Sequence, residues 1–262
     1  MSILCYHSVE PEWRSALAVT PEAFAAQCAW LAKHRQVVPL ERAVDLLDSS
    51  YRLPSGVAAL TFDDGFAELY THALPSLLRY GFSATIFLVA ETLTPGGRIV
   101  DWVDTPPRWP LRTLTIDQVL EMQERGVKFG SHSWAHRDLT TLSEAECVRD
   151  LRASRDLLEA LVRQRISFLA YPRGLHHAHV RRAAERAGYE RSFSLPEGPE
   201  PVGPHAVPRV GIYGGNGFIT LAVKSSRWYL GMHRSGLSPV ARAVVRRHKL
   251  LARPVTRLTR RR

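Results

Sequence analysis

Short apolar runs recur along the chain, and most are followed by a turn and then by a longer amphipathic segment. Runs that are apolar at successive positions are typical of strands buried on both faces. Strands are expected at residues 2–6, 36–39, 58–62, 84–89, 127–131, 168–171, 191–194 and 207–210. Helices are expected at residues 20–35, 41–47, 68–80, 116–125, from 143 onward and at 178–187. This alternation predicts a parallel sheet covered by helices, either closed as a barrel or left open.

Two of the expected helices begin with recognisable capping residues. Thr20 followed by Pro21 has the pattern of a cap and a first-turn proline. Ser143 with Glu146 three residues later has the pattern of a capping box, in which each side chain satisfies a backbone N–H of the other residue. These signals favour helices over irregular coil at both places.

The charge of the chain is concentrated towards its C-terminal end. The formal net charge is +10, from 35 Lys and Arg against 25 Asp and Glu. Twelve basic residues and no acidic ones lie from Lys224 onward, so the part before Lys224 is near neutral, with 23 basic and 25 acidic residues. The sequence therefore predicts a folded domain at 1–223 and a basic tail, helical or disordered, at 224–262. A nucleic-acid-binding protein is disfavoured because the basic residues form no recognisable reading module.

Composition narrows the class of protein further. With 262 residues, 45% of them hydrophobic, the chain can bury a large core. Cys5, Cys28 and Cys147 are widely spaced, so neither a disulfide framework nor a cysteine zinc site is indicated. The first residues turn polar too early for a secretion signal, and no run approaches the roughly 18 apolar residues of a spanning helix. A cytoplasmic protein with free thiols is therefore expected.

Two adjacent carboxylates follow the apolar strand at 58–62. Asp63 and Asp64 stand at its C-terminal end, where catalytic side chains of parallel α/β proteins gather, and Gly65 lets the chain turn away. Adjacent side chains at a strand end point in different directions, so one carboxylate could bind a metal while the other faces a water molecule. A solvated turn with a helix cap explains the same three residues.

Two histidines follow the strand at 127–131. His132 and His136 are four residues apart, so both imidazoles reach one ion if the loop takes a helical turn. Together with one carboxylate they make a two-His, one-carboxylate set that leaves positions open for water and a substrate oxygen. Such a set suits zinc or a similar first-row ion. Histidines that only cap the loop are the alternative.

Two further clusters stand at strand ends. Residues 170–174 read Ala-Tyr-Pro-Arg-Gly, a strand that runs into a loop containing a proline and a glycine. His7 follows the first strand directly, after Tyr6. A histidine at this place is either a satisfied core residue or a functional one, and its position at a strand end favours function.

The clusters together resemble the polysaccharide deacetylase family, the NodB-homology domain of carbohydrate esterase family four. Its three motifs are matched by Thr-Phe-Asp-Asp-Gly at 61–65, Ser-His-Ser-Trp-Ala-His at 131–136 and Ala-Tyr-Pro-Arg-Gly at 170–174. The match spans about residues 2–210. The resemblance implies an incomplete (β/α) barrel of about seven strands. It also implies one divalent metal ion held by Asp64, His132 and His136, with Asp63 as the general base.

Two departures from the common family pattern affect the other roles. No leucine-histidine-aspartate motif follows Val210, where many members carry the general-acid histidine. Tyr6 and His7 instead resemble a permuted branch, that of the poly-N-acetylglucosamine deacetylases, so His7 is the expected general acid and His205 its weaker rival. No arginine precedes Pro172 in the third motif, and Arg209 is the candidate for orienting the base.

The same resemblance implies an N-acetylated amino sugar as substrate, in a polysaccharide, an oligosaccharide or a lipid-linked glycan. Zinc is the first expectation for the metal, while cobalt and nickel share the needed geometry. The candidates for contacting the substrate are Tyr171, Pro172 and Arg173, and also Trp102 and Trp109 in a long loop at 93–112. Ordinary packing of an irregular loop is the favoured alternative for the two tryptophans. A deformylase or other amidase of the same fold, and a catalytically dead binding module, are the alternative functions.

The tail calls for an explanation apart from catalysis. Residues 218–230 are expected to form a final helix, and beyond them apolar residues alternate with arginines in a loosely amphipathic pattern. Basic segments of this kind bind anionic membrane surfaces. The sequence thus predicts peripheral attachment to the inner face of a membrane, with a disordered, solvated tail as the alternative.

Overall fold

A single parallel sheet forms the centre of the molecule. The computed structural model describes residues 2–50, 54–196, 200–226 and 228–234. The strands of the central sheet are β1 (Ser2–Tyr6), β4 (Gln36–Val37), β5 (Val57–Phe62), β6 (Ala84–Leu88), β7 (Lys128–Ser131), β8 (Phe168–Ala170), β9 (Arg191–Ser194), β10 (Val207–Pro208) and β11 (Val210–Gly211). Their order is β10-β9-β8-β7-β6-β5-β1-β11, with β4 paired to β5, and every pairing is parallel.

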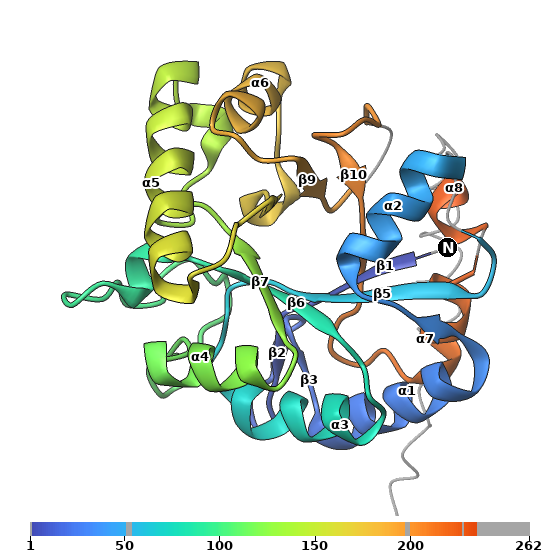
Figure 1. Cartoon of the computed structure of the whole chain (residues 1–262). Helices are drawn as coiled ribbons and strands as arrows, with labels where there is room; N and C mark the ends of the chain where they lie inside the picture. The colour runs from blue at the N-terminus through green and yellow to red at the C-terminus, as the bar shows by residue number, and fades with distance from the viewer. Residues whose placement is uncertain (1, 51–53, 197–199, 227, 235–262) are drawn as a thin grey trace, which may run out of the picture.

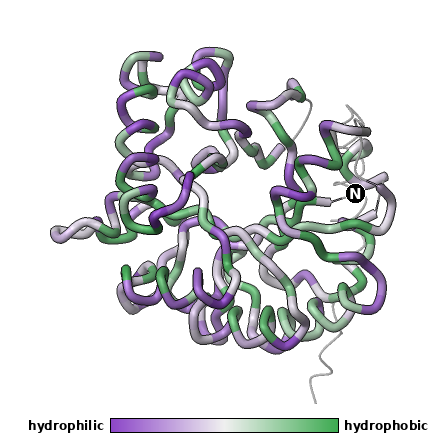
Figure 2. Tube along the Cα trace, in the orientation of Figure 1, coloured by the Kyte–Doolittle hydropathy of each residue, from purple (hydrophilic) through white to green (hydrophobic). Residues whose placement is uncertain are grey.

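Helices surround this sheet (Figure 1). They are α1 (Pro21–His34), α2 (Leu40–Ser50), α3 (Leu74–Arg79), α4 (Ile116–Glu124), α5 (Glu144–Val162), α6 (Ala178–Arg186), α7 (Phe218–Lys224) and α8 (Tyr229–Arg234). The predicted caps are confirmed, because Thr20 accepts from the backbone of Ala23 and Ser143 forms a capping box with Glu146. Figure 2 shows hydrophilic and hydrophobic residues alternating along these helices, as expected where one face packs on a sheet.

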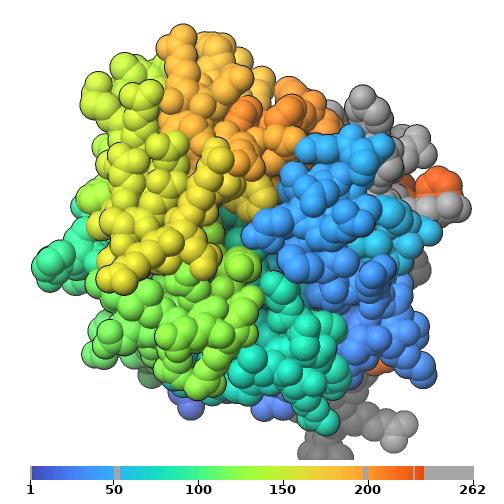
Figure 3. All heavy atoms as spheres, viewed as in Figure 1, coloured from blue at the N-terminus to red at the C-terminus, as the bar shows by residue number. Residues whose placement is uncertain are grey.

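The strands are buried on both faces. On β1, Leu4 and Tyr6 belong to the apolar layer shared with the helices, together with Phe24 of α1. Ile3 belongs to a second cluster, inside the barrel, that includes Phe87 of β6. Side chains fill the space that the ribbon leaves open at the centre of Figure 1, as the space-filling view of Figure 3 shows. Cys5 has the same alternation as Ile3, so its thiol points to the interior.

The last two strands lie at opposite edges of the sheet. The sequence predicts one strand at 207–210, but the structure divides it at Arg209 into β10 and β11. β10 pairs with β9, and β11 pairs with β1 at the other end of the strand order. This short segment therefore joins the two edges, which confirms the incomplete barrel. Among the described residues the central sheet has nine strands, against the expected number of about seven. Arg209 therefore lies at the seam between β10 and β11, where the two edges of the sheet meet.

Three local predictions differ from the structure. The helix expected at 68–80 begins as a π-helical turn, Leu69–Ala73, before α3. Pro75 has no N–H to donate, and its ring would crowd a carbonyl of the preceding turn, so a wider turn relieves it. The expected final helix at 218–230 is divided into α7 and α8. A small parallel pair, β2 (Ser8–Val9) and β3 (Ala18–Val19), was not expected.

The first part of the predicted tail is attached to the barrel. Lys224, at the end of α7, donates from Nζ to the carbonyl of Gly211 at 2.7 Å and to Oδ1 of Asn216 at 2.9 Å. Residues 235–262, which hold most of the predicted tail, lie outside the described residues. Within the described part of the chain, no helix is long and apolar enough to cross a membrane.

Candidate active site

Polar side chains gather where the strands end at one mouth of the barrel. Asp63 and Asp64 follow β5, His132 follows β7, and His7 follows β1. Arg209 reaches the same place from the seam between β10 and β11. All five are buried, with at most 9% of their surface exposed. Groups that titrate are seldom buried together without a functional reason, so this is the candidate active site.

Asp64, His132 and His136 form a compact set of possible metal ligands. Their ligand atoms all lie within 4.8 Å of one another. Oδ1 of Asp64 is 3.7 Å from Nε2 of His132 and 3.3 Å from Nε2 of His136. Nδ1 of His132 is 2.8 Å from the carbonyl oxygen of Ala170, so Nδ1 carries the hydrogen and Nε2 keeps its lone pair for a metal. The residues present therefore fit a divalent ion of the zinc type.

The turn that carries the two histidines is not the helical turn considered from their spacing. Ser133 and His136 have positive φ angles of 68° and 54°. Asp64 and Arg173 also have positive φ, at 69° and 56°, so four of the five such non-glycine residues of the described chain lie at this site. Left-handed conformations of this kind are strained and persist where the surroundings hold them. Strain therefore concentrates around the proposed ligands.

Asp63 is held by a buried guanidinium. Nη1 and Nη2 of Arg209 donate to Oδ1 and Oδ2 of Asp63, each at 2.7 Å. Burial alone would raise the pKa of Asp63, but the charge of Arg209 outweighs it and holds the pKa well below its usual range. Asp63 is therefore ionised at all ordinary pH values. This contact is the one proposed for Arg209 from the sequence, although its role in orienting a base stays a prediction.

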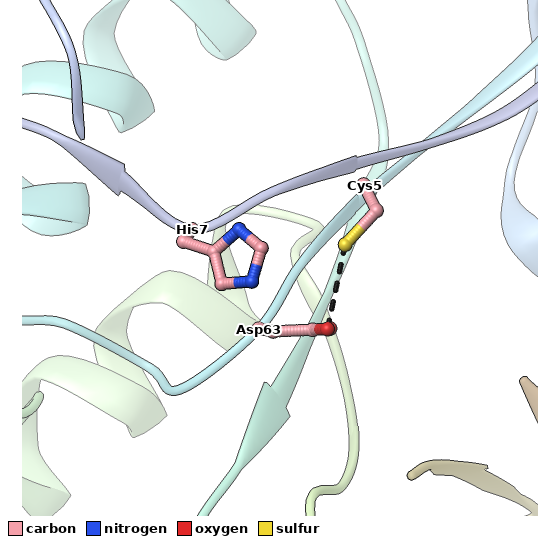
Figure 4. Close-up of side chains that lie close together, drawn as sticks. All are labelled: Cys5, His7 and Asp63. Carbon is pink, nitrogen blue, oxygen red and sulfur yellow. Dashed lines mark hydrogen bonds between the residues drawn. The ribbon is translucent and has the colours of Figure 1, made fainter. Parts of the chain in front are cut away.

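Cys5 and His7 lie beside Asp63 (Figure 4). The Cys5 thiol donates to Oδ2 of Asp63 at 3.3 Å, and burial raises the thiol pKa well above its usual value, so the thiol keeps its proton. Burial lowers the pKa of His7 against the opposing pull of Asp64 and Asp63. From the sequence, Cys5 was expected only as a free thiol with no role in the site. Cys5 lies two residues before His7, at the end of β1, and this spacing was the signal that could have found it.

The residues of the third motif take different positions. Tyr171 is fully buried, and its hydroxyl donates to the carbonyl of His205 at 3.0 Å. Pro172 is buried in a 3-10 turn, Pro172–Gly174, that follows β8. Arg173 is exposed, and its guanidinium pairs with Asp104 at 3.0 Å. Of these three residues, only Arg173 therefore presents its side chain to solvent.

The remaining candidates are divided between the site and the surface. The indole N–H of Trp102 donates to Oδ1 of Asp64 at 2.9 Å, whereas Trp109 lies on the same loop with 37% of its surface exposed. His205 is half-buried, and its Nδ1 lies 3.1 Å from the hydroxyl of Ser192. The hydrogen bond of its imidazole is thus with β9, while His7 lies next to Asp63.

The family of the chain follows from its sequence as well as from this geometry. A family model described as Polysaccharide deacetylase matches residues 50–192, more than half of the 262 residues. The chain belongs to the polysaccharide deacetylase family. The family predicted from the three motifs is thereby confirmed.

Two known proteins are similar to this chain in sequence. YxkH of Bacillus subtilis (strain 168), a polysaccharide deacetylase by name, is 27% identical over 199 residues, which are 76% of this chain and 65% of YxkH. The poly-beta-1,6-N-acetyl-D-glucosamine N-deacetylase of Escherichia coli (strain K12) is 28% identical over 145 residues, 50% of this chain and 20% of that enzyme. The chain thus spans less than two thirds of the length of these relatives.

A solved structure has the same fold. The Streptococcus pyogenes deacetylase PplD in complex with acetate superposes with a TM-score of 0.74 at 24% identity, over 86% of this chain and 98% of that chain. At this identity the likeness concerns the fold alone, and it agrees with the incomplete barrel.

Proposed function

We propose that the protein is a metal-dependent hydrolase that removes an N-acetyl group from an amino sugar. The observation that carries the proposal is the position of Asp64, His132 and His136 beside a buried, ionised Asp63, in a chain of this family. A ligand set with open positions next to a carboxylate base is the arrangement that amide hydrolysis needs. The relative that acts on poly-β-1,6-N-acetylglucosamine supports an amino sugar as substrate.

Each residue of the site has its own role in the proposed deacetylation. A divalent ion bound at Asp64, His132 and His136 would polarise the amide carbonyl and acidify a water molecule. Asp63 takes the proton of the attacking water, while Arg209 holds the carboxylate in place and ionised. His7, in its charged form, gives a proton to the departing amine, which is otherwise a poor leaving group.

Two finer points belong to the same proposal. The backbone N–H of Arg173 is a candidate for stabilising the negative charge that develops on the former carbonyl oxygen. Zinc is the first choice of metal, with cobalt and nickel as substitutes, because two imidazoles and one carboxylate suit all three ions. The sugar is part of a polysaccharide, an oligosaccharide or a lipid-linked glycan precursor.

One experiment tests both the reaction and the metal. Protein stripped with a chelator should release no acetate from chitin-type oligosaccharides, and added zinc or cobalt should restore release. His132→Ala should remain folded but bind no stoichiometric ion in elemental analysis, because it removes one of three ligands. Full metal content in that variant would refute the ligand assignment. Formate or a ring-opened amide as the product, with no acetate from any sugar, would favour another amidase of this fold.

We also propose that the protein is cytoplasmic and attaches peripherally to the anionic inner face of a membrane. Five of the large hydrophobic residues that the structure exposes lie close together in the sequence, in α7, in α8 or beside them: Phe218, Ile219, Val223, Trp228 and Met232. The sequence from Lys224 to its end holds twelve basic residues and no acidic one. Exposed apolar side chains next to positive charge support binding to an anionic lipid surface.

A further inference from the structure

Trp102 contacts two of the three proposed metal ligands at once. Its indole N–H donates to Oδ1 of Asp64 at 2.9 Å, and its ring stacks on the imidazole of His136 with centroids 4.9 Å apart and planes at 21°. Oδ1 is also the oxygen that lies 3.3 Å from Nε2 of His136. A carboxylate oxygen has two lone pairs, so it can accept the indole hydrogen and still bind an ion.

The two histidines differ in what orients their rings. Nδ1 of His132 is fixed by the carbonyl of Ala170, whereas the buried Nδ1 of His136 has no hydrogen-bond partner within the described residues. A metal-binding imidazole is usually oriented by a hydrogen bond from its second nitrogen. The His136 ring also meets the ring of His132 edge-on, with centroids 4.9 Å apart and planes at 64°, so stacking on Trp102 supplies the face-to-face contact that helps to set its plane.

The two ligands that Trp102 contacts are also the strained ones. Asp64 and His136 both have positive φ, whereas His132 is absent from the positive-φ residues of the described chain. Strained backbones keep their conformation only where neighbouring contacts hold them. Trp102 supplies such a contact to each of the two.

The loop around Trp102 is itself anchored by two other parts of the chain. The Arg173 guanidinium donates to the carbonyl of Trp102 at 2.8 Å and pairs with Asp104 at 3.0 Å. The indole N–H of Trp13 donates to the carbonyl of Thr105 at 2.8 Å. These contacts fix the position of the Trp102 indole in the site, although the loop has no regular secondary structure there.

We propose that Trp102 is a positioning residue of the metal centre, which fixes the Asp64 carboxylate through its N–H and the His136 imidazole through its ring. This role differs from contact with the substrate, the function considered for Trp102 from the sequence. The inference rests on the metal site of the proposed function, and it concerns the affinity and geometry of that site before any sugar is bound.

Metal affinity gives the first test. Trp102→Phe keeps a ring against His136 but removes the N–H, and it should weaken zinc binding about tenfold in competition with a chelator; Trp102→Ala removes both contacts and should weaken it about a hundredfold. Trp30→Phe is the matched control, because Trp30 also stacks on a histidine, His34, at 4.6 Å and 16°, but on α1. The control should bind zinc as the wild type does.

The cobalt spectrum gives a second test that a general loss of stability would not change. At saturating cobalt, the visible absorption bands of Trp102→Phe should differ in position or intensity from those of the wild type, while those of Trp30→Phe should superimpose on them. Wild-type affinity and spectrum in Trp102→Phe would overturn this inference alone. A wild-type protein that binds no stoichiometric ion would overturn it together with the proposed function.

Discussion

At the scale of single residues, the hydrogen bonds to Asp63 determine which of its oxygens is available. An ionised carboxylate has about four acceptor sites. Arg209 occupies one site on each oxygen, and the Cys5 thiol occupies a second on Oδ2. Among the described contacts, Oδ1 therefore keeps one site open. We expect this oxygen to be the one that accepts the proton of the attacking water.

Replacing that carboxylate tests its role. Asp63→Asn should keep the metal and lose at least about a hundredfold in turnover, the usual scale of general-base catalysis, because the amide cannot accept the proton. The variant leaves the buried Arg209 without a counter-charge, so its thermal unfolding has to be measured alongside the rate. A folded Asp63→Asn protein that works at the wild-type rate would remove Asp63 from the mechanism.

The pH profile tests His7. A general acid must be charged, so turnover should fall as pH rises through the pKa of His7. Burial lowers that pKa from its ordinary value of 6.5, and the midpoint of the alkaline limb of kcat/KM should therefore lie below 6.5. His7→Ala should lose turnover with the metal retained and no longer show that limb. His205→Ala is the control, and loss of the limb there would transfer the role to His205.

The residues that the sequence identified are those whose position depends on strand ends. Asp64 and His132 lie together because β5 and β7, which flank β6, end at the same mouth of the barrel. The left-handed turn at His136 could not be predicted, since a spacing of four indicates only a helical turn. Trp102 could not be assigned either, because its contacts depend on the path of a loop without periodicity.

At the scale of elements, the segment around Arg209 shows what the hydrophobic pattern leaves open. Residues 207–210 were correctly expected to be extended, but a local pattern says nothing about which neighbours a strand pairs with. The structure uses this segment at both edges of the sheet, and the break between the two pairings falls at Arg209. The same segment therefore joins the two edges of the sheet and places Arg209 next to Asp63, the proposed base.

The turn after β8 allows a sharp test of packing at the site. Gly174 has φ +73°, and an added Cβ would lie 2.6 Å from the backbone N of Leu195, which cannot move aside. Gly215 has φ +78° with nothing within 4 Å of such a Cβ. Gly215→Ala should lower the free energy of unfolding by about 1–2 kcal/mol through backbone strain alone. Gly174→Ala should lower it by roughly 1–3 kcal/mol more through overpacking.

Urea unfolding of the two variants measures this difference directly. The comparison holds the backbone strain nearly constant, so the excess loss in Gly174→Ala reports the contact with Leu195. Equal losses in both variants would mean that the turn at Gly174 adapts, and that the packing around the third motif is looser than these distances indicate.

At the scale of the whole molecule, the proposed catalytic site and the proposed membrane-binding region occupy separate parts of the chain. The proposed site lies at the strand ends, whereas five exposed apolar side chains and the uncompensated positive charge are found from α7 onward. A hydrophobic contact alone would be insensitive to salt, while basic residues contribute about 1 kcal/mol each near an anionic surface and are screened by salt. The two contributions can therefore be separated by experiment.

Flotation with liposomes that contain anionic lipid makes this separation. The full chain should float, its binding should weaken as salt rises, and a version that ends at residue 234 should lose most binding yet release acetate from a soluble substrate. The double variant Ile219→Ser, Val223→Ser tests the apolar contribution. It should also weaken flotation, because both side chains are more than half exposed on α7. Ile99→Ser with Val202→Ser is the matched control, since these two exposed apolar residues lie elsewhere, at 75% and 61% exposure. Equal flotation of the full and shortened chains would exclude this role for the tail, and preferential binding of RNA at the same salt would favour a nucleic-acid partner instead.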